Sequence, residues 1–116
     1  MTAQEVVKEL LSGVTHILHA EKEVLELEDR RRELILELQI AESNLILQEG
    51  GPINGKNAEI RAAQLLAETA PERIVINEFE REIARKKCQL NGYQNLFKVN
   101  QGIIALLASR PDITKL

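Results

Sequence analysis

Two histidines and a glutamate near the start of the chain have the spacing of metal ligands. His16, His19 and Glu23 lie three and four residues apart, so an α-helix would present them on one face. Imidazole nitrogens and carboxylate oxygens are ligands that bind Zn²⁺ and similar cations. No Glu precedes either His by three residues, so the Glu-x-x-His element of di-iron helical bundles is missing. We therefore expect surface or subunit-contact histidines and no metal site.

Acidic residues gather in two stretches, 21–29 and 78–82. Carboxylates clustered on facing helices hold magnesium in all-α nucleotide pyrophosphohydrolases. Glu23, Glu26 and Asp29 follow one another at intervals of three residues, a spacing that suits such a cluster. However, Glu26, Glu28 and Glu82 each have a basic residue four positions later, which is typical of an exposed coiled-coil flank. The pattern favours a solvated surface, and this enzyme class stays as the second alternative.

Residues 50–57, GGPINGKN, come close to the phosphate-binding loop G-x-x-x-x-G-K-[ST]. Asn57 stands where that motif has a hydroxyl for magnesium, and a long predicted helix precedes the segment where the motif needs a strand. We interpret the segment as a turn between two helices, and we expect no cofactor.

Cys88 is the only cysteine, which excludes an intramolecular disulfide and a site built from several thiolates. A lone thiol fits a reducing compartment, so we expect a cytoplasmic protein, in the host cytoplasm if it is phage-encoded. No histidine is close to Cys88 in the sequence, so we interpret it as a small buried flank residue and not as a nucleophile. The start of the chain lacks the apolar core of a signal peptide, and no stretch approaches the roughly 20 apolar residues of a membrane span.

The elements that must position these residues are long helices. Ala, Glu, Lys, Leu and Arg supply 59 of the 116 residues, which is the composition of coiled coils. Only three residues are aromatic, which argues against platforms for stacking nucleic-acid bases, and a net charge of −3 argues against a surface that attracts DNA everywhere. We predict one all-α domain, 1–116, with a long helix 2–48, a turn 49–55, a short connecting helix 56–68, a long helix 70–110 and a tail 111–116.

The ends of these helices carry recognisable signals. The turn is rich in Gly and Pro, which stop the first helix. Thr69 and Glu72 fit a capping box, in which the Thr69 hydroxyl satisfies early amides of the last helix, and Arg110-Pro111 ends that helix. The short helix is expected to cover the 35–47 end of the first one.

Apolar residues spaced by four and three mark one seam on each long helix. Residues 1–48 have a net charge of −5 and residues 70–116 a net charge of +3, which favours packing one helix on the other. We therefore predict a long antiparallel, coiled-coil-like hairpin. The seam positions are Val6, Leu10, Gly13, Ile17, Ala20, Val24, Leu27, Arg31, Leu34, Leu38, Ala41 and Leu45, and then Ile76, Phe79, Ile83, Lys86, Leu90, Tyr93, Phe97, Asn100, Ile104 and Leu107.

Folding the hairpin with Gln48 beside Ala70 predicts that paired residue numbers add to roughly 118. The triplets 30–32 and 85–87 would then form one basic belt. Glutamates four positions earlier can form ion pairs with Arg30, Arg32 and Lys86. Arg31, Arg85 and Lys87 have less obvious acidic partners. Two interpretations of Arg31, Arg85, Lys86 and Lys87 stay open: contact with nucleic-acid phosphates, and salt bridges to a neighbouring subunit, which the surrounding glutamates favour.

A second apolar stripe on the first helix predicts self-association. Val7, Leu11, Val14 and Leu18 continue the spacing of four and three beside the seam. On the other long helix only Val99, Ile103 and Leu106 are available near them, and these lie off its seam. Exposed apolar side chains forfeit about 1.5–3 kcal/mol each, so we expect a homo-oligomer that assembles into a helical bundle.

The order of a long helix, the segment NGKNAEIRAAQL and a second long helix resembles small helical proteins encoded by phages and prophages. The resemblance implies a phage-related accessory protein and brings no catalytic residues. We therefore expect a non-enzymatic protein that acts through self-association and protein–protein contacts. The alternative is a small DNA-associated factor in phage replication or recombination that uses the basic belt.

Overall fold

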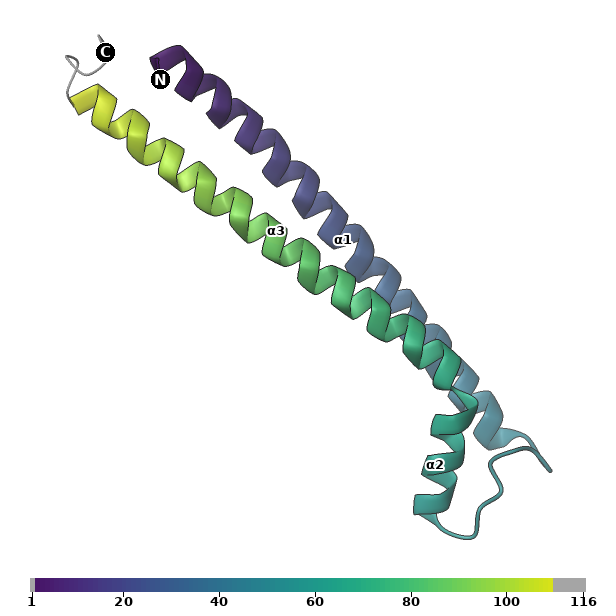
Figure 1. Cartoon of the computed structure of the whole chain (residues 1–116). Helices are drawn as coiled ribbons and strands as arrows, with labels where there is room; N and C mark the ends of the chain where they lie inside the picture. The colour runs from purple at the N-terminus through teal and green to yellow at the C-terminus, as the bar shows by residue number, and fades with distance from the viewer. Residues whose placement is uncertain (1, 110–116) are drawn as a thin grey trace. The chain divides into compact units, whose positions relative to one another are not determined.

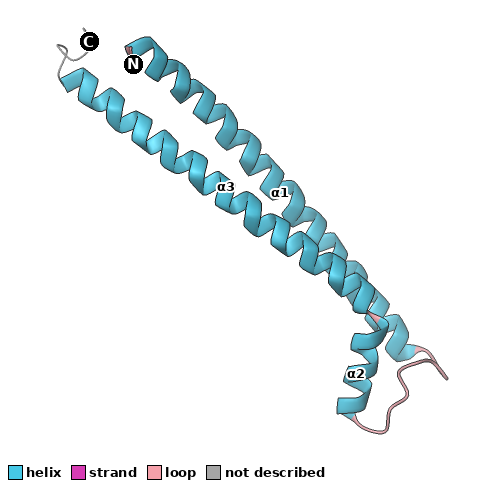
Figure 2. Ribbon diagram, viewed as in Figure 1, coloured by secondary structure: helices cyan, strands magenta, loops and turns pink. Residues whose placement is uncertain are grey.

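The computed structural model describes residues 2–109 and contains three helices (Figures 1 and 2). These are α1, Ala3–Leu47; α2, Ala58–Glu68; and α3, Ala70–Ser109. No strand occurs within residues 2–109, so the predicted all-α class is confirmed there. The helix bounds lie within two residues of those predicted. The expected stop at Arg110-Pro111 and the tail 111–116 lie outside the described residues.

The chain divides into two compact units, and α1 and α3 each contribute to both. Unit 1 contains α1 up to Leu25 and α3 from Ala84 onward. Unit 2 contains residues 26–83 and therefore includes α2.

Unit 1 is an antiparallel helix pair with a small core. Its buried apolar side chains are Val6, Ala20 and Val24, all on α1, and Asn100 of α3 is buried with them. His16 stacks on Tyr93, and a Cβ added to Gly13 would meet Phe97 at 3.6 Å. Residue numbers that rise along α1 thus meet falling numbers along α3. Figure 1 shows the purple start of α1 and the yellow end of α3 in this unit.

Unit 2 pairs the second part of α1 with the first part of α3, also antiparallel. Its buried apolar residues are Leu38, Ile76 and Ile83. Arg31 pairs with Glu80, and Glu42 pairs with Arg73. Both units therefore draw their cores from the predicted seams.

The seam prediction is confirmed in both units. All twelve seam positions of α1 and all ten of α3 are buried or half-buried, although most other residues of these helices are exposed. Because α-helical side chains at steps of three and four share one face, such a pattern is what one helix packed against another produces. The charged seam members Arg31 and Lys86 are half-buried.

A hydrogen-bonded loop joins α1 to α2 in unit 2. Gly50 has a φ of 67°, in the region that favours glycine, just after the end of α1. Asn57 caps α2, because its side chain accepts a hydrogen bond from the Ile60 amide at 2.9 Å. The Gln64 side-chain oxygen accepts hydrogen bonds from the amides of Asn54 and Gly55. These bonds fasten the loop onto the first turns of α2.

The predicted capping box at Thr69 is wrong. The buried Thr69 hydroxyl donates to the Leu65 carbonyl at 2.7 Å and accepts from the Arg73 guanidinium at 3.0 Å. The cause is the backbone of Thr69, with φ −106° and ψ 10°, whereas an N-cap residue normally has an extended backbone. Thr69 therefore ends α2 and leads almost directly into α3.

The predicted register of 118 is also wrong. Residue numbers add to 109 for His16 with Tyr93, to 111 for Arg31 with Glu80, and to 115 for Glu42 with Arg73. The two long helices do not end level with each other in unit 2. In α1, five helical residues follow Glu42, whereas in α3 only three precede Arg73. The end of α1 therefore extends two residues further than the start of α3, and the loop and α2 connect these two ends.

The short helix covers the end of α1 less than expected. Ile35 is half-buried, but Ile46 and Leu47 remain exposed. On α2 itself no residue is fully buried, and Ile60 and Leu66 are exposed as well. The contacts of α2 thus involve its loop and the junction with α3 more than the end of α1.

Candidate functional site

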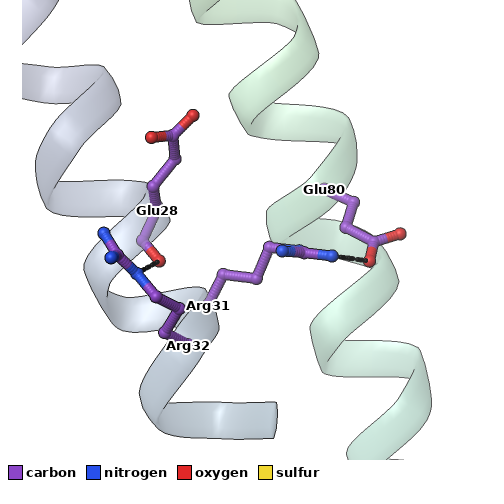
Figure 3. Close-up of polar contacts among 4 residues, drawn as sticks. All are labelled: Glu28, Arg31, Arg32 and Glu80. Carbon is purple, nitrogen blue, oxygen red and sulfur yellow. Dashed lines mark hydrogen bonds and ion pairs between the residues drawn. The ribbon is translucent and has the colours of Figure 1, made fainter.

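Arg31 forms an ion pair inside unit 2. Its Nε and Nη2 atoms both donate to one carboxylate oxygen of Glu80, at 3.2 and 3.0 Å (Figure 3). Its neighbour Arg32 instead bonds along α1, to the Glu28 carbonyl at 3.5 Å and to the Asp29 carboxylate at 2.5 Å. The expectation that Arg31 is poorly satisfied is therefore wrong, because the observed register brings Glu80 within reach.

Lys86 forms an ion pair inside unit 1. Its ammonium lies 2.6 Å from a carboxylate oxygen of Glu23, and His19 Nε2 lies 2.8 Å from the other oxygen of that carboxylate. The hydrogen bond from Lys86 lowers the pKa of the Glu23 carboxyl from its ordinary value, and the charges of Lys86 and His19 lower it further. Partial desolvation opposes this shift.

The four cations predicted to form a belt are divided between the units. Arg31 belongs to unit 2, whereas Arg85, Lys86 and Lys87 belong to unit 1. Arg85 and Lys87 are exposed, and each also has an interaction within the chain. Nucleic-acid contact and intersubunit salt bridging at these residues both stay predictions.

The three residues with metal-ligand spacing have other contacts. His16 stacks on Tyr93 with ring centroids 5.2 Å apart and an interplanar angle of 15°. His19 and Glu23 bond to each other. Over residues 2–109, no group of three or more His, Cys, Asp or Glu side chains is arranged to hold a metal ion. This applies to Glu23, Glu26 and Asp29 as well.

Cys88 is exposed, so its interpretation as a buried flank residue is wrong. It lies two residues after the seam position Lys86, and two residues correspond to about 200° of helix rotation. The thiol therefore lies on the side of α3 that faces away from α1.

The clearest candidate surface is the α1 stripe, Val7, Leu11, Val14 and Leu18. These side chains are 49%, 66%, 40% and 60% exposed in unit 1. An open hollow of about 240 Å³ continues the stripe at Val7, and it is lined by Ala3, Val7, Ile104, Leu107 and Ala108. None of the helices within residues 2–109 combines the length and apolar character that crossing a membrane requires.

A second apolar surface lies on α3 of unit 1. Leu96, Val99 and Leu106 are exposed and Ile103 is half-buried, and we call these four residues the α3 stripe. The sequence indicated Val99, Ile103 and Leu106, but Leu96 was missed. Each member directly precedes a seam residue, which is the signal that identifies Leu96 as well.

No protein-family model, curated protein or solved structure matches this chain.

Proposed function

We propose that this chain is a non-enzymatic accessory or structural protein that works through helix-mediated self-association and protein–protein contacts. The observation that supports the proposal is the exposed α1 stripe in unit 1. Contiguous apolar patches on a protein surface commonly mark interaction sites. The likeness of the segment NGKNAEIRAAQL to phage-encoded helical proteins suggests a phage-related role.

The size of the apolar stripe makes a partner energetically valuable. Fully burying one such side chain is worth about 1.5–3 kcal/mol, and a typical small protein is stable by only about 5–15 kcal/mol. Only three apolar residues of unit 1 are buried among those described, all on α1. A second copy that covered the stripe would thus add a large fraction of the stability of the unit.

Sedimentation equilibrium at micromolar concentration tests self-association. We expect the unmodified chain to exceed its monomer mass of 13.1 kDa, and we expect Leu11→Glu/Leu18→Glu to restore that mass. The matched control is Leu36→Glu/Ile40→Glu, which adds the same two charges at positions of similar exposure in unit 2 and should leave the association unchanged. A stable, folded monomer before any mutation would refute the proposal.

Nucleic-acid binding is less well supported as an alternative. Glu80 and Glu23 already neutralise Arg31 and Lys86. If the basic residues nevertheless bind phosphates, DNA affinity should fall steeply with salt, and Arg85→Glu/Lys87→Glu should weaken it. An affinity that does not depend on these residues would count against that alternative.

A further inference from the structure

On each long helix, the residues directly before the seam residues form one flank, and the residues directly after them form another. The matching flanks of α1 and α3 lie beside each other. In unit 2, Glu42 and Arg73 form an ion pair. Glu42 directly follows the seam residue Ala41, and Arg73 directly follows position 72, which lies one heptad before the seam residue Phe79. Glu37 and Val75, which directly precede the seam residues Leu38 and Ile76, line one groove together. Residues that follow the seam therefore share one face of an antiparallel pair, and residues that precede it share the opposite face.

Unit 1 obeys the same rule. Val7 and Ala108 directly follow the seam residues Val6 and Leu107, and both line the hollow of about 240 Å³. His16, which directly precedes the seam residue Ile17, contacts α3 at Tyr93. Residues directly before and directly after a seam residue are two positions apart, which is about 200° of helix rotation, so the preceding and following flanks of unit 1 are separate surfaces.

This rule places the two apolar stripes of unit 1 on opposite faces. Every member of the α1 stripe directly follows a seam residue, because Val7, Leu11, Val14 and Leu18 come directly after Val6, Leu10, Gly13 and Ile17. Every member of the α3 stripe directly precedes one. A single partner helix cannot cover both stripes, because they point away from each other.

The two stripes match in length. Each has four apolar residues, and they span 11 residue steps on α1 and 10 on α3. At about 1.5 Å per residue these lengths are roughly 17 and 15 Å. When both are read in the chain direction, Val7, Leu11, Val14 and Leu18 can lie against Leu96, Val99, Ile103 and Leu106 one for one.

The charges beside the stripes are complementary. Lys98 directly follows the seam residue Phe97, so it shares the face of the α1 stripe, and Phe97 lies beside Gly13 at the middle of that stripe. Glu9 directly precedes the seam residue Leu10, so it shares the face of the α3 stripe, as does Glu5. Both Lys98 and Glu9 are exposed.

We propose that copies of this chain associate head to tail, with the α1 stripe of one copy on the α3 stripe of the next. This inference rests on the proposed self-association. It brings Lys98 of the first copy over the acidic flank at Glu9 of the second. A symmetric contact centred on either stripe, with like helices over each other, would instead bring Lys98 near Lys98 or Glu9 near Glu9. A contact between two different surfaces leaves one of each kind free, so it builds a ring or a growing chain of copies and not a closed dimer.

Two face-specific variants test the arrangement by sedimentation velocity. Leu11→Glu/Leu18→Glu blocks the α1 stripe, and Val99→Glu/Leu106→Glu blocks the α3 stripe. All four residues are exposed, so circular dichroism should show the helix content of the unmodified chain. We expect each variant alone to be a monomer and their equimolar mixture to form a dimer of twice the mass, because only one competent contact remains.

The possible outcomes separate this inference from the proposed function. If the Val99→Glu/Leu106→Glu variant still dimerises alone, the contact is symmetric through the α1 stripe. Head-to-tail association is then wrong although self-association stands. If the mixture stays monomeric while the unmodified chain associates, the inference is also overturned. If the unmodified chain is itself a monomer, both proposals fail.

A charge exchange gives a second test that leaves the apolar residues in place. Lys98→Glu and Glu9→Lys should each weaken association of the otherwise unmodified chain, and the double variant should recover most of it. The control Lys8→Glu changes an exposed charge one residue away and should have a smaller effect than Glu9→Lys. Equal effects of all three single changes would contradict a specific contact between Lys98 and Glu9.

Discussion

The carboxylate of Glu23 lies 2.6 Å from the ammonium of Lys86, and this contact joins an acidic residue of α1 to a seam position of α3 within unit 1. Glu23 directly precedes the seam residue Val24, so the ion pair lies at the edge of the core. Its partner His19 lies one turn away along α1. The pair thus marks the level at which the two helices meet in unit 1.

The Glu23 carboxyl should titrate below the ordinary pKa of glutamate in the folded chain. Because folding lowers this pKa, the contribution of the ion pair to stability is present above the unfolded-state pKa and is lost as the pH falls through the lowered folded-state value. The change Lys86→Met should move the pKa of Glu23 back towards its ordinary value. Carboxyl ¹³C chemical shifts followed against pH measure this, and an unchanged Glu23 titration would contradict the assigned cause.

Shortening a seam residue in unit 2 should destabilise the chain strongly. Leu38 is 8% exposed, so Leu38→Ala should lower the free energy of unfolding by about 2–5 kcal/mol. The matched control is Leu36→Ala, because Leu36 lies two positions away on the same helix and is 57% exposed. Its effect should stay within about 0.5 kcal/mol. Urea unfolding of both variants measures the difference, and equal losses would mean that the seam lies on another face.

The loop before α2 should not tolerate a side chain at Gly55. An added Cβ would lie 2.4 Å from Cγ2 of Ile60, so Gly55→Ala forces the loop away from α2. We expect a loss of about 1–3 kcal/mol, as is typical of overpacking. Gly102→Ala is the control, since a Cβ there meets nothing within 4 Å and alanine favours a helix by about 1 kcal/mol. Thermal unfolding should show opposite shifts, and a neutral Gly55→Ala would contradict the described loop packing.

The seams could be predicted from the sequence, but the register could not. Steps of three and four identify the face of each helix, and every predicted seam residue is indeed buried or half-buried. The pattern repeats every seven residues, so sliding one helix by a heptad leaves the same faces in contact. Arg31 shows the consequence: a register of 118 places it opposite residue 87, and its observed partner Glu80 lies seven residues earlier.

Other differences arise from interactions that local spacing does not encode. The Thr69 pattern satisfies the rule for a capping box, but the backbone there stays near the helical region and redirects the hydroxyl to Leu65. The Gln64 contacts with the loop span nine and ten residues and follow no periodic rule. By contrast, the α1 stripe could be predicted, because apolar residues beyond the needs of one seam are visible in the sequence alone.

The stacking of His16 on Tyr93 also gives the molecule a built-in optical reporter. The chain has one tyrosine and no tryptophan, so its intrinsic ultraviolet fluorescence arises chiefly from a residue in unit 1. Far-ultraviolet circular dichroism, in contrast, records helix loss in both units. When the two signals are followed during denaturation, a fluorescence change that precedes the loss of ellipticity would reveal that unit 1 opens while unit 2 is still helical, without any dye or engineered label.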